Sequence, residues 1–382
     1  MSIPFRDLLK KVGSGTHTSI DLSREESALA TQMMLEQTAT PAQIGAFMIA
    51  QRIKRPSISE LVGMLDCYEQ LGPQLHSSGG SPIVLNNPYD GRTRTAPVVP
   101  LTALILAAAG VPTVLHGGDR MPTKYGLPLV ESWLTLGLDW RALSLPLVQK
   151  IFEKTSLGFV YLPQHFPAAH GLTEYRDQIG KRPTLATVEL MWTPHPQPCH
   201  AVSSFVHPPT EDRTRQAYWQ RQSYHFTTVK GLEGSCDLPR SRTVILGLGN
   251  VDQRGEPLFE RLLLHPKDYG FEGEDMALDE TYATAMAEAV VGSSGELTQA
   301  AIWNGGFYLW RMGAAASIEA GLSQAQTLLE TGQAAAKLQQ IKAAIAAASN
   351  LGSADGSKEQ RPEQQPDQPS ERIPSSSSSI SP

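Results

Sequence analysis

The sequence has few cysteines, no large excess of either charge and no long apolar run. Its 382 residues include three cysteines (Cys67, Cys199 and Cys236) without CxxC spacing, which excludes a disulfide framework and a zinc ribbon. The formal net charge is -6, so the excess of Lys and Arg that is typical of dedicated nucleic-acid-binding proteins is missing. The longest apolar stretch, residues 101–109, is too short to span a bilayer, and no secretory signal pattern opens the chain. We therefore expect a soluble cytoplasmic protein with no membrane segment.

Residues 1–78 are predicted to form a small domain of three or four short antiparallel helices. A capping box joins the first residue of a helix start to the side chain three positions later, and each box here opens an apolar run at helical spacing. The three boxes are Ser23 with Glu26, Thr40 with Gln43, and Ser57 with Glu60.

Residues 79–348 alternate short apolar runs with longer helical patterns, which is typical of βαβ units and of a mostly parallel sheet flanked by helices. The predicted fold class is therefore α/β, and the helical domain precedes the α/β domain in the sequence. The predicted strands lie at residues 83–85, 114–115, 159–161, 201–206, 226–229 and 244–246. The predicted helices span residues 101–109, 127–136, 279–291, 297–310 and 318–329. Residues 349–382 are rich in Ser, Pro, Gln and Glu, which predicts a disordered tail.

The loop after the first predicted strand has the composition of an anion site. Residues 86–95 include Asp90, Gly91, Arg92, Thr93 and Arg94 and lead into a helix. Backbone amides and the helix dipole favour an anion at such a position. The alternative is a plain solvated turn.

The loop after the second predicted strand is also rich in hydrogen-bond donors. Paired glycines let the backbone approach a ligand closely, while Arg, Thr and Lys donate to phosphate and an Asp can bind a ribose hydroxyl or a magnesium-bound water. The residues in question are His116, Gly117, Gly118, Asp119, Arg120, Thr123 and Lys124. Two such loops on neighbouring strands suggest a phosphorylated sugar or a nucleotide as the ligand.

Two further pairs of residues are candidates for ligand binding. His165 and Arg176, beyond the third predicted strand, could hold an aromatic carboxylate, although each taken singly is more often structural. Glu233 and Asp237 lie in a glycine-containing loop and could hold magnesium through waters, while a simple polar connection is the alternative.

Several segments carry a resemblance to a known family. They are residues 40–47, 107–111 ahead of His116-Gly117, 159–163, 175–180 and 300–313. Through them the chain resembles, from about residue 8 to residue 341, the anthranilate phosphoribosyltransferase family with its type 3 glycosyltransferase-like fold.

The resemblance implies a homodimer formed through the helical domain and a reaction of the kind used in tryptophan biosynthesis. A 5-phosphoribosyl group would pass from phosphoribosyl pyrophosphate, bound with Mg²⁺, to an aromatic amine such as anthranilate. The first two loops would bind the donor, His165 and Arg176 the acceptor, and Glu233 and Asp237 the metal.

Two motifs depart from the family pattern. The pyrophosphate loop Gly-Thr-Gly-Gly-Asp-Gly retains only Asp90-Gly91 here, and the metal pair Asp-Glu falls on Cys236-Asp237. His116-Gly117 with Asp119, Pro122 and Thr123, and Gly231-x-Glu233-Gly234, resemble a divergent branch of the family, some of whose members are associated with nucleic acid.

These departures leave a second hypothesis open. The chain could be a catalytically degenerate relative whose basic loops bind nucleic acid or another polyanion, since a dimer can gather basic groups in one groove despite an acidic total. The arginines concerned are Arg92, Arg94, Arg213, Arg215, Arg240 and Arg242.

Overall fold

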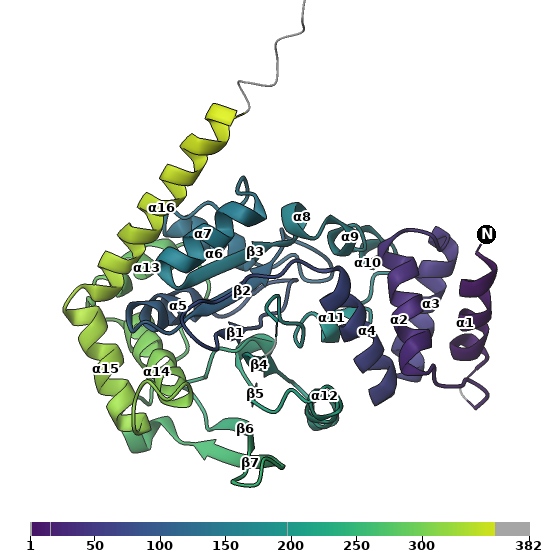
Figure 1. The fold of residues 1–382 in the computed structure, drawn as a ribbon. Coiled ribbons are helices and arrows are strands. Elements are labelled where there is room, and N and C mark those ends of the chain that lie inside the picture. The colour runs from purple at the N-terminus through teal and green to yellow at the C-terminus, as the bar shows by residue number, and fades with distance from the viewer. Residues whose placement is uncertain (1, 16, 197, 356–382) are drawn as a thin grey trace, which may run out of the picture.

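The N-terminal part of the molecule is a bundle of helices, as predicted. The computed structural model describes residues 2–15, 17–196 and 198–355, and Figure 1 shows the bundle at one end of the molecule. Both hydrogen bonds of the capping box form at each of the three predicted helix starts. The bundle consists of α1 (Ile3–Gly13), α2 (Arg24–Leu35), α3 (Pro41–Lys54) and α4 (Ile58–Leu71).

Close packing in this bundle depends on one glycine. A Cβ atom at Gly63 of α4 would lie 2.1 Å from the carbonyl oxygen of Arg24 and 2.9 Å from the Cβ of Ser27. Only a residue without a side chain therefore allows α4 to lie this close to α2.

A seven-stranded sheet forms the centre of the molecule, with the order β3-β2-β1-β4-β5-β6-β7. Strands β1 to β5 pair in parallel, whereas β6 and β7 extend the sheet in antiparallel fashion. The mostly parallel sheet confirms the predicted fold class. The strands are β1 (Ile83–Leu85), β2 (Thr113–Gly117), β3 (Leu157–Tyr161), β4 (His200–Ser204), β5 (Phe226–Val229), β6 (Val244–Val251) and β7 (Pro257–Leu264).

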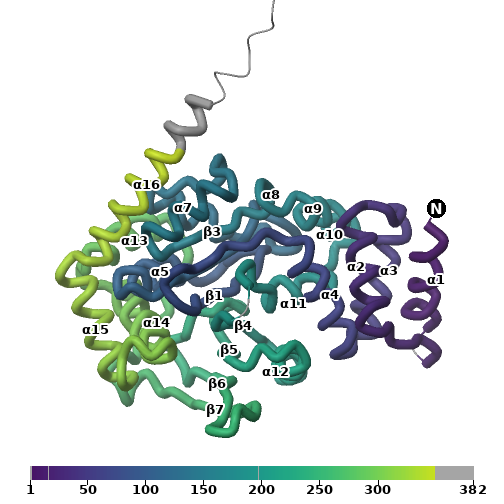
Figure 2. The backbone as a smooth tube through the Cα atoms, in the orientation of Figure 1, coloured from purple at the N-terminus to yellow at the C-terminus, as the bar shows by residue number. Residues whose placement is uncertain are grey.

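Helices cover the sheet, and the most enclosed of them is α5 (Val99–Ala108), in which every residue from 99 to 107 is buried. Helix α5 packs against α14 and α16, which Figure 2 shows on the side of the molecule away from the bundle. The longer helices are α6 (Leu129–Thr135), α7 (Leu145–Thr155), α12 (Pro208–Gln220), α13 (Tyr282–Val290), α14 (Glu296–Arg311), α15 (Ile318–Glu330) and α16 (Gln333–Asp355). Within the described ranges, no helix is long and apolar enough to cross a membrane.

Short helices lie between the sheet and the bundle. They are α8 (Leu162–His165), α9 (Pro167–His170), α10 (Thr173–Gln178) and α11 (Leu185–Val188), and the 3-10 turns are η1 (Leu232–Gly234) and η2 (Pro266–Tyr269). Helix α3 contacts α10, and α4 contacts α11 and α12, so the bundle packs directly against the α/β part.

The predicted domain limits can be located in this fold. The division between residues 78 and 79 falls in the connection between α4 and β1, and it stays a prediction. Helix α16 continues to Asp355, seven residues into the predicted tail of 349–382. The remainder of that tail, residues 356–382, lies outside the described residues.

Strands β1 and β4 define the point of the sheet where a ligand is expected. They are neighbours in parallel, but the chain after β1 runs through α5 to β2 on one side, and the chain after β4 runs through α12 to β5 on the other. In open α/β sheets ligands bind beyond the carboxyl ends of the strands at such a reversal.

Candidate functional site

The loop after β1 folds around Arg92, whose side chain is only 4% exposed. Its NH1 group donates to Asp237 Oδ2 at 2.6 Å and to Ser235 Oγ at 2.8 Å, and its Nε group donates to Glu233 Oε1 at 3.4 Å. The guanidinium therefore lies between the two carboxylates that the sequence suggested as a metal pair.

The Glu233 carboxylate is held by an unusually complete set of donors. It accepts hydrogen bonds from the backbone N–H groups of Thr93 (3.3 Å), Arg94 (2.9 Å) and Thr95 (2.9 Å), and from the Thr93 and Thr95 hydroxyls, both at 3.1 Å. Lys124 Nζ lies 3.6 Å away. We call residues 92–95 together with Lys124 the anion cup.

The anion cup changes the acidity of its occupant. Burial raises the pKa of Glu233, but the backbone N–H groups of Thr95 and Arg94 and the charge of Arg92 outweigh this and hold it far below the usual range for glutamate. Glu233 has a backbone φ of 51°, a left-handed conformation that side chains rarely adopt. The anion that the loop after β1 holds in this structure is thus the chain's own carboxylate.

The expected magnesium ligands are consequently not equivalent. Both oxygens of Glu233 are engaged by the anion cup, so this carboxylate does not fit a metal ligand. Asp237 Oδ2 accepts from Arg92 and from the N–H of Val98, whereas its Oδ1 is buried and has no hydrogen-bond partner in the described part of the chain. Among the described residues no group of three or more His, Cys, Asp or Glu could hold a metal ion.

The two predicted donor loops lie against each other, as expected from neighbouring strands. Arg92 N–H donates to the Leu127 carbonyl at 3.0 Å, and Leu127 N–H donates back to the Arg92 carbonyl at 2.7 Å. Gly91 permits this approach, because it has a φ of 77° and its Cβ position would lie 2.5 Å from the backbone of Gly126. Asp90 is buried beside them and accepts from Arg182 Nε at 2.6 Å.

Near the end of β2, just ahead of the loop that follows it, His116 does not face a ligand. It is fully buried between Asn86, whose Oδ1 lies 2.6 Å from its Nε2, and the Tyr89 hydroxyl, which contacts its Nδ1. Burial lowers the pKa of His116 to about 3, so the ring is neutral. Its role is to fix the end of β1 against the end of β2.

The other residues of this loop are divided between packing and solvent. Gly117 and Gly118 are buried, and Thr123 is exposed. Asp119 accepts from the Tyr161 hydroxyl at 2.8 Å, and Arg120 pairs with Glu131 at 2.7 Å.

Both donor loops line a cavity of about 430 Å³. Its wall includes Arg92, Thr93, Arg120 and Tyr125, and it faces residues 278–283 at the start of α13. Lining by both loops makes it the candidate site for the donor.

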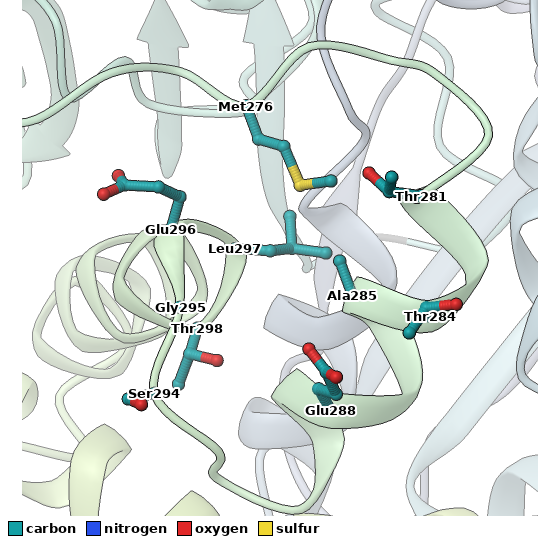
Figure 3. Close-up of a pocket in the computed structure, with 10 residues that line it drawn as sticks. All are labelled: Met276, Thr281, Thr284, Ala285, Glu288, Ser294, Gly295, Glu296, Leu297 and Thr298. Atoms are coloured by element: carbon teal, nitrogen blue, oxygen red, sulfur yellow. The ribbon is translucent and has the colours of Figure 1, made fainter.

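Another cavity, of about 310 Å³, lies between α13 and α14 (Figure 3). It is lined by the carboxylates Glu288 and Glu296 and by no Lys, Arg or His. This lining does not suit a phosphate.

The predicted acceptor residue His165 is held by the backbone. Its Nδ1 accepts from the Tyr161 N–H at 2.9 Å, and its Nε2 donates to the Leu143 carbonyl at 2.7 Å. Because both ring nitrogens are used, His165 orders the chain after β3 and has no free polar atom for an acceptor.

The second predicted acceptor residue, Arg176, is buried and already paired. Its NH2 group lies 3.0 Å from Glu189 Oε2, and its NH1 group contacts the sulfur of Met121. Burial raises the pKa of Glu189, and the charge of Arg176 partly offsets this effect. Glu189 was missed in the sequence because nothing in its neighbourhood marks a partner 13 residues away.

The arginines proposed for polyanion binding are scattered. Arg92 and Arg240 are buried in ion pairs, Arg240 with Glu296 at 2.5 Å, so their assignment to a polyanion surface was wrong. Arg215 lies over the Trp219 ring at 4.8 Å. Arg94 and Arg242 are exposed and Arg213 is half-buried, so these can reach solvent.

A comparison with protein families finds a match for the N-terminal helices. The helical bundle domain model of the glycosyl transferase family matches residues 6–72, which are α1 to α4. The α/β part, with the loops at the carboxyl ends of β1 and β2, lies beyond the matched residues.

Two relatives that are similar over nearly the whole chain carry one name. The chain is 26% identical over 349 residues to the anthranilate phosphoribosyltransferase of Azorhizobium caulinodans, covering 88% of this chain and 95% of that one. It is 27% identical over 348 residues to the enzyme of the same name from Moorella thermoacetica, covering 88% and 96%. These findings confirm the resemblance to the anthranilate phosphoribosyltransferase family.

Solved structures show the same fold. The anthranilate phosphoribosyltransferase of Thermus thermophilus superposes with a TM-score of 0.71 at 18% identity, over 89% of this chain and 99% of that one. The Saccharomyces cerevisiae enzyme in complex with phosphoribosyl pyrophosphate and Mg superposes with a TM-score of 0.72 at 14% identity, over 91% and 99%. The predicted nearness to the divergent branch stays a prediction.

Proposed function

We propose that this protein is a phosphoribosyltransferase that moves the 5-phosphoribosyl group of phosphoribosyl pyrophosphate to an aromatic amine such as anthranilate. The observation that carries the proposal is the anion cup, in which three backbone N–H groups and two hydroxyls converge on one anionic group. Its position at the carboxyl end of β1 and the fold shared with enzymes of this activity support the same reading.

In the proposed donor complex, the pyrophosphate takes the place of the Glu233 carboxylate in the anion cup. Phosphate oxygens are acceptors of the same kind as carboxylate oxygens, so the donors of Thr93, Arg94 and Thr95 can serve either anion. Lys124 Nζ, 3.6 Å from Glu233, would meet the incoming charge. The ribose phosphate would lie toward Arg120 and Thr123 in the adjoining loop.

Magnesium would enter this site with the donor, as in the yeast complex. Mg²⁺ commonly binds through one or two carboxylates together with substrate phosphates. Asp237 fits this role through its buried Oδ1, which has no hydrogen-bond partner among the described residues. The metal would neutralise charge that develops on the leaving pyrophosphate.

The acceptor side of the proposal rests on Arg176. A planar guanidinium matches a carboxylate, but here Glu189 already occupies it, so an anionic acceptor must compete with that side chain. With donor and acceptor oriented and a good leaving group, the reaction needs positioning more than a strong general base.

The proposed assembly is a homodimer in the cytoplasm. A groove of about 810 Å³ lies along α1 and α3, lined by Leu9, Val12, Ile49, Ala50 and Ile53 among others. Exposed apolar surface of this kind marks protein contact sites, which supports dimerisation through the bundle. Cys67 and Cys236 are free, buried thiols, in keeping with a reducing compartment.

Calorimetric titration with phosphoribosyl pyrophosphate, with and without Mg²⁺, tests the proposal, followed by an assay of anthranilate consumption by its fluorescence. We expect saturable donor binding that magnesium strengthens, and turnover of an aromatic amine. Absence of donor binding at millimolar concentration under both conditions would refute the assignment and leave only the fold.

A further inference from the structure

A cavity of about 490 Å³ lies where the helical bundle meets the start of α12, apart from the donor cavity. Its lining comes from three separate parts of the chain: the end of α3 with the start of α4, the loop from residue 182 to 187, and the connection from β4 into α12. None of the described residues that line it is Asp or Glu. The basic ones are Arg52, Arg55, Arg182, His207 and Arg213, and we call this site the arginine cavity.

Two of its guanidinium groups have no partner in the part of the chain that the structure describes. Neither Arg55 nor Arg213 makes a side-chain hydrogen bond or an ion pair there. Asp212, the neighbour of Arg213, pairs instead with Arg215 at 3.5 Å. Most arginines of this protein that face other residues are neutralised by a carboxylate, whereas Arg55 and Arg213 reach solvent at the cavity and can meet an anion from outside.

The remaining two arginines are fixed in place. Arg52 NH1 donates to the carbonyl of Arg182 at 2.7 Å, and Arg182 itself reaches Asp90 with its Nε at 2.6 Å. These bonds join the bundle to the loop that carries Arg182 and hold both guanidinium groups at the cavity, where Asp90 balances the charge of Arg182. A preformed arrangement of this kind lowers the entropy cost of binding a ligand.

The position in the fold agrees with a ligand site. His207 and Pro208 follow β4, which is one of the two strands at the reversal of the sheet. Pro208 and Pro209 have no N–H group, so helix amides at the first positions of α12 cannot hold an anion. Recognition must therefore come from the guanidinium groups.

We propose that the arginine cavity binds a small molecule bearing two or more phosphate charges, at a site separate from the proposed donor and acceptor sites. The fork of an arginine matches phosphate oxygens in pairs, and several arginines facing one space match a diphosphate or a bisphosphate. The volume falls within the range of small-molecule sites. This proposal does not depend on phosphoribosyl transfer.

The test is calorimetric titration of the full chain with inorganic pyrophosphate at low ionic strength. We expect wild type to bind it, and the double variant Arg55→Ala/Arg213→Ala to bind it about tenfold or more weakly, since charge-assisted hydrogen bonds are lost. Because neither side chain has a partner among the residues that the structure describes, the variant should keep the wild-type melting temperature, which is measured alongside.

A matched control separates this site from the rest of the surface. Lys150→Ala/Arg254→Ala removes the same charge from exposed positions elsewhere and should bind pyrophosphate as wild type does. Undetectable binding to wild type, or equal binding to wild type and the Arg55/Arg213 variant, would overturn the proposal. It would also be overturned if a single-stranded oligonucleotide bound more tightly than pyrophosphate through the same two arginines, because the surface would then serve a polymer.

Discussion

At the scale of single residues, the two cationic groups best suited to hold substrate anions are both paired with carboxylates of the chain itself. Arg92 lies against Glu233 and Asp237, and Arg176 lies against Glu189. Each carboxylate keeps a buried guanidinium satisfied, and each is also a competitor for an incoming anion. Glu233, the Arg176–Glu189 pair and the neutral His116 each give a testable expectation.

Replacing Glu233 by Ala should open the anion cup. The N–H groups of Thr93, Arg94 and Thr95 then have no acceptor, so inorganic pyrophosphate should bind there about tenfold or more tightly than to the same place in wild type. Titration should show this as a second equivalent of pyrophosphate beyond that taken by the arginine cavity.

The matched control for this prediction is Glu288→Ala, which removes a carboxylate from the cavity of Figure 3 and should change nothing. If folded Glu233→Ala protein takes up no additional pyrophosphate, Glu233 serves only to hold the loop together.

The Arg176 and Glu189 pair should be strongly coupled in stability. Arg176→Ala leaves a buried carboxylate without its partner, which typically costs about 3 to 5 kcal/mol of unfolding free energy. Adding Glu189→Gln removes the uncompensated charge and should recover part of that loss. Urea unfolding of the two single variants and the double variant measures the coupling, and strictly additive effects would contradict the pairing.

The neutral His116 makes stability depend on pH. Burial lowers the pKa of His116 to about 3, against an ordinary value near 6.5. The unfolded chain therefore takes up a proton that the folded protein refuses, and stability from this group falls as pH drops from about 6.5 toward 3, by up to about 1.4 kcal/mol per pH unit. In His116→Gln, unfolding between pH 6 and pH 4 should take up about one proton fewer than in wild type, so the unfolding free energy should depend less steeply on pH. An unchanged pH dependence would contradict this account.

At the scale of helices and strands, elements marked by a complete local pattern were predicted, whereas some elements without such a pattern were missed. The capping boxes fixed the starts of α2, α3 and α4, because each box is complete within four residues. Strand β7 was not predicted, since most of its side chains are exposed and its apolar residues do not alternate. Helix α12 was missed as well, because its two opening prolines and charged surface hide the few residues that it buries.

The packing of α2 against α4 gives a prediction at this scale. Gly63→Ala should lower the unfolding free energy by about 1 to 3 kcal/mol, because the new Cβ would meet the Arg24 carbonyl at 2.1 Å and the helices must separate. Gly45→Ala in α3 is the matched control, since its nearest neighbour would be Ile179 Cγ2 at 3.8 Å. There the better helix propensity of Ala should leave stability equal or raise it. Thermal unfolding of both variants tests this prediction, and an equal loss of stability in Gly63→Ala and Gly45→Ala would contradict it.

At the scale of the whole molecule, the site could be located from the sequence but not described. The alternation of strands and helices brought the loops after β1 and β2 together, as the structure confirms. The contacts that determine their chemistry join residues far apart in the chain, such as Glu233 and the N–H of Arg94, which are 139 residues apart. No local pattern records such a pairing, so Glu233 was interpreted as a metal ligand.

The proposed dimer is a prediction of this scale. Ile53 is 69% exposed at the edge of the groove along α1 and α3, so Ile53→Glu should place a charge in the interface and shift the protein toward monomer. Light scattering after size-exclusion chromatography measures the mass of both forms. Val291→Glu, an equally apolar exposed position in the α/β part, should not change it. A wild-type monomer would rule out the assembly.

The hydrogen bond from Arg182 to Asp90 connects two proposed ligand-binding sites. Arg182 lines the arginine cavity, and Asp90 begins the loop that folds into the anion cup. If occupancy of the cavity draws Arg182 away from Asp90, the loop loses a support and its affinity for the donor changes. Thermodynamic reciprocity then requires the donor to change affinity at the cavity by the same factor. A single buried aspartate would in this way allow the level of one metabolite to adjust the use of another.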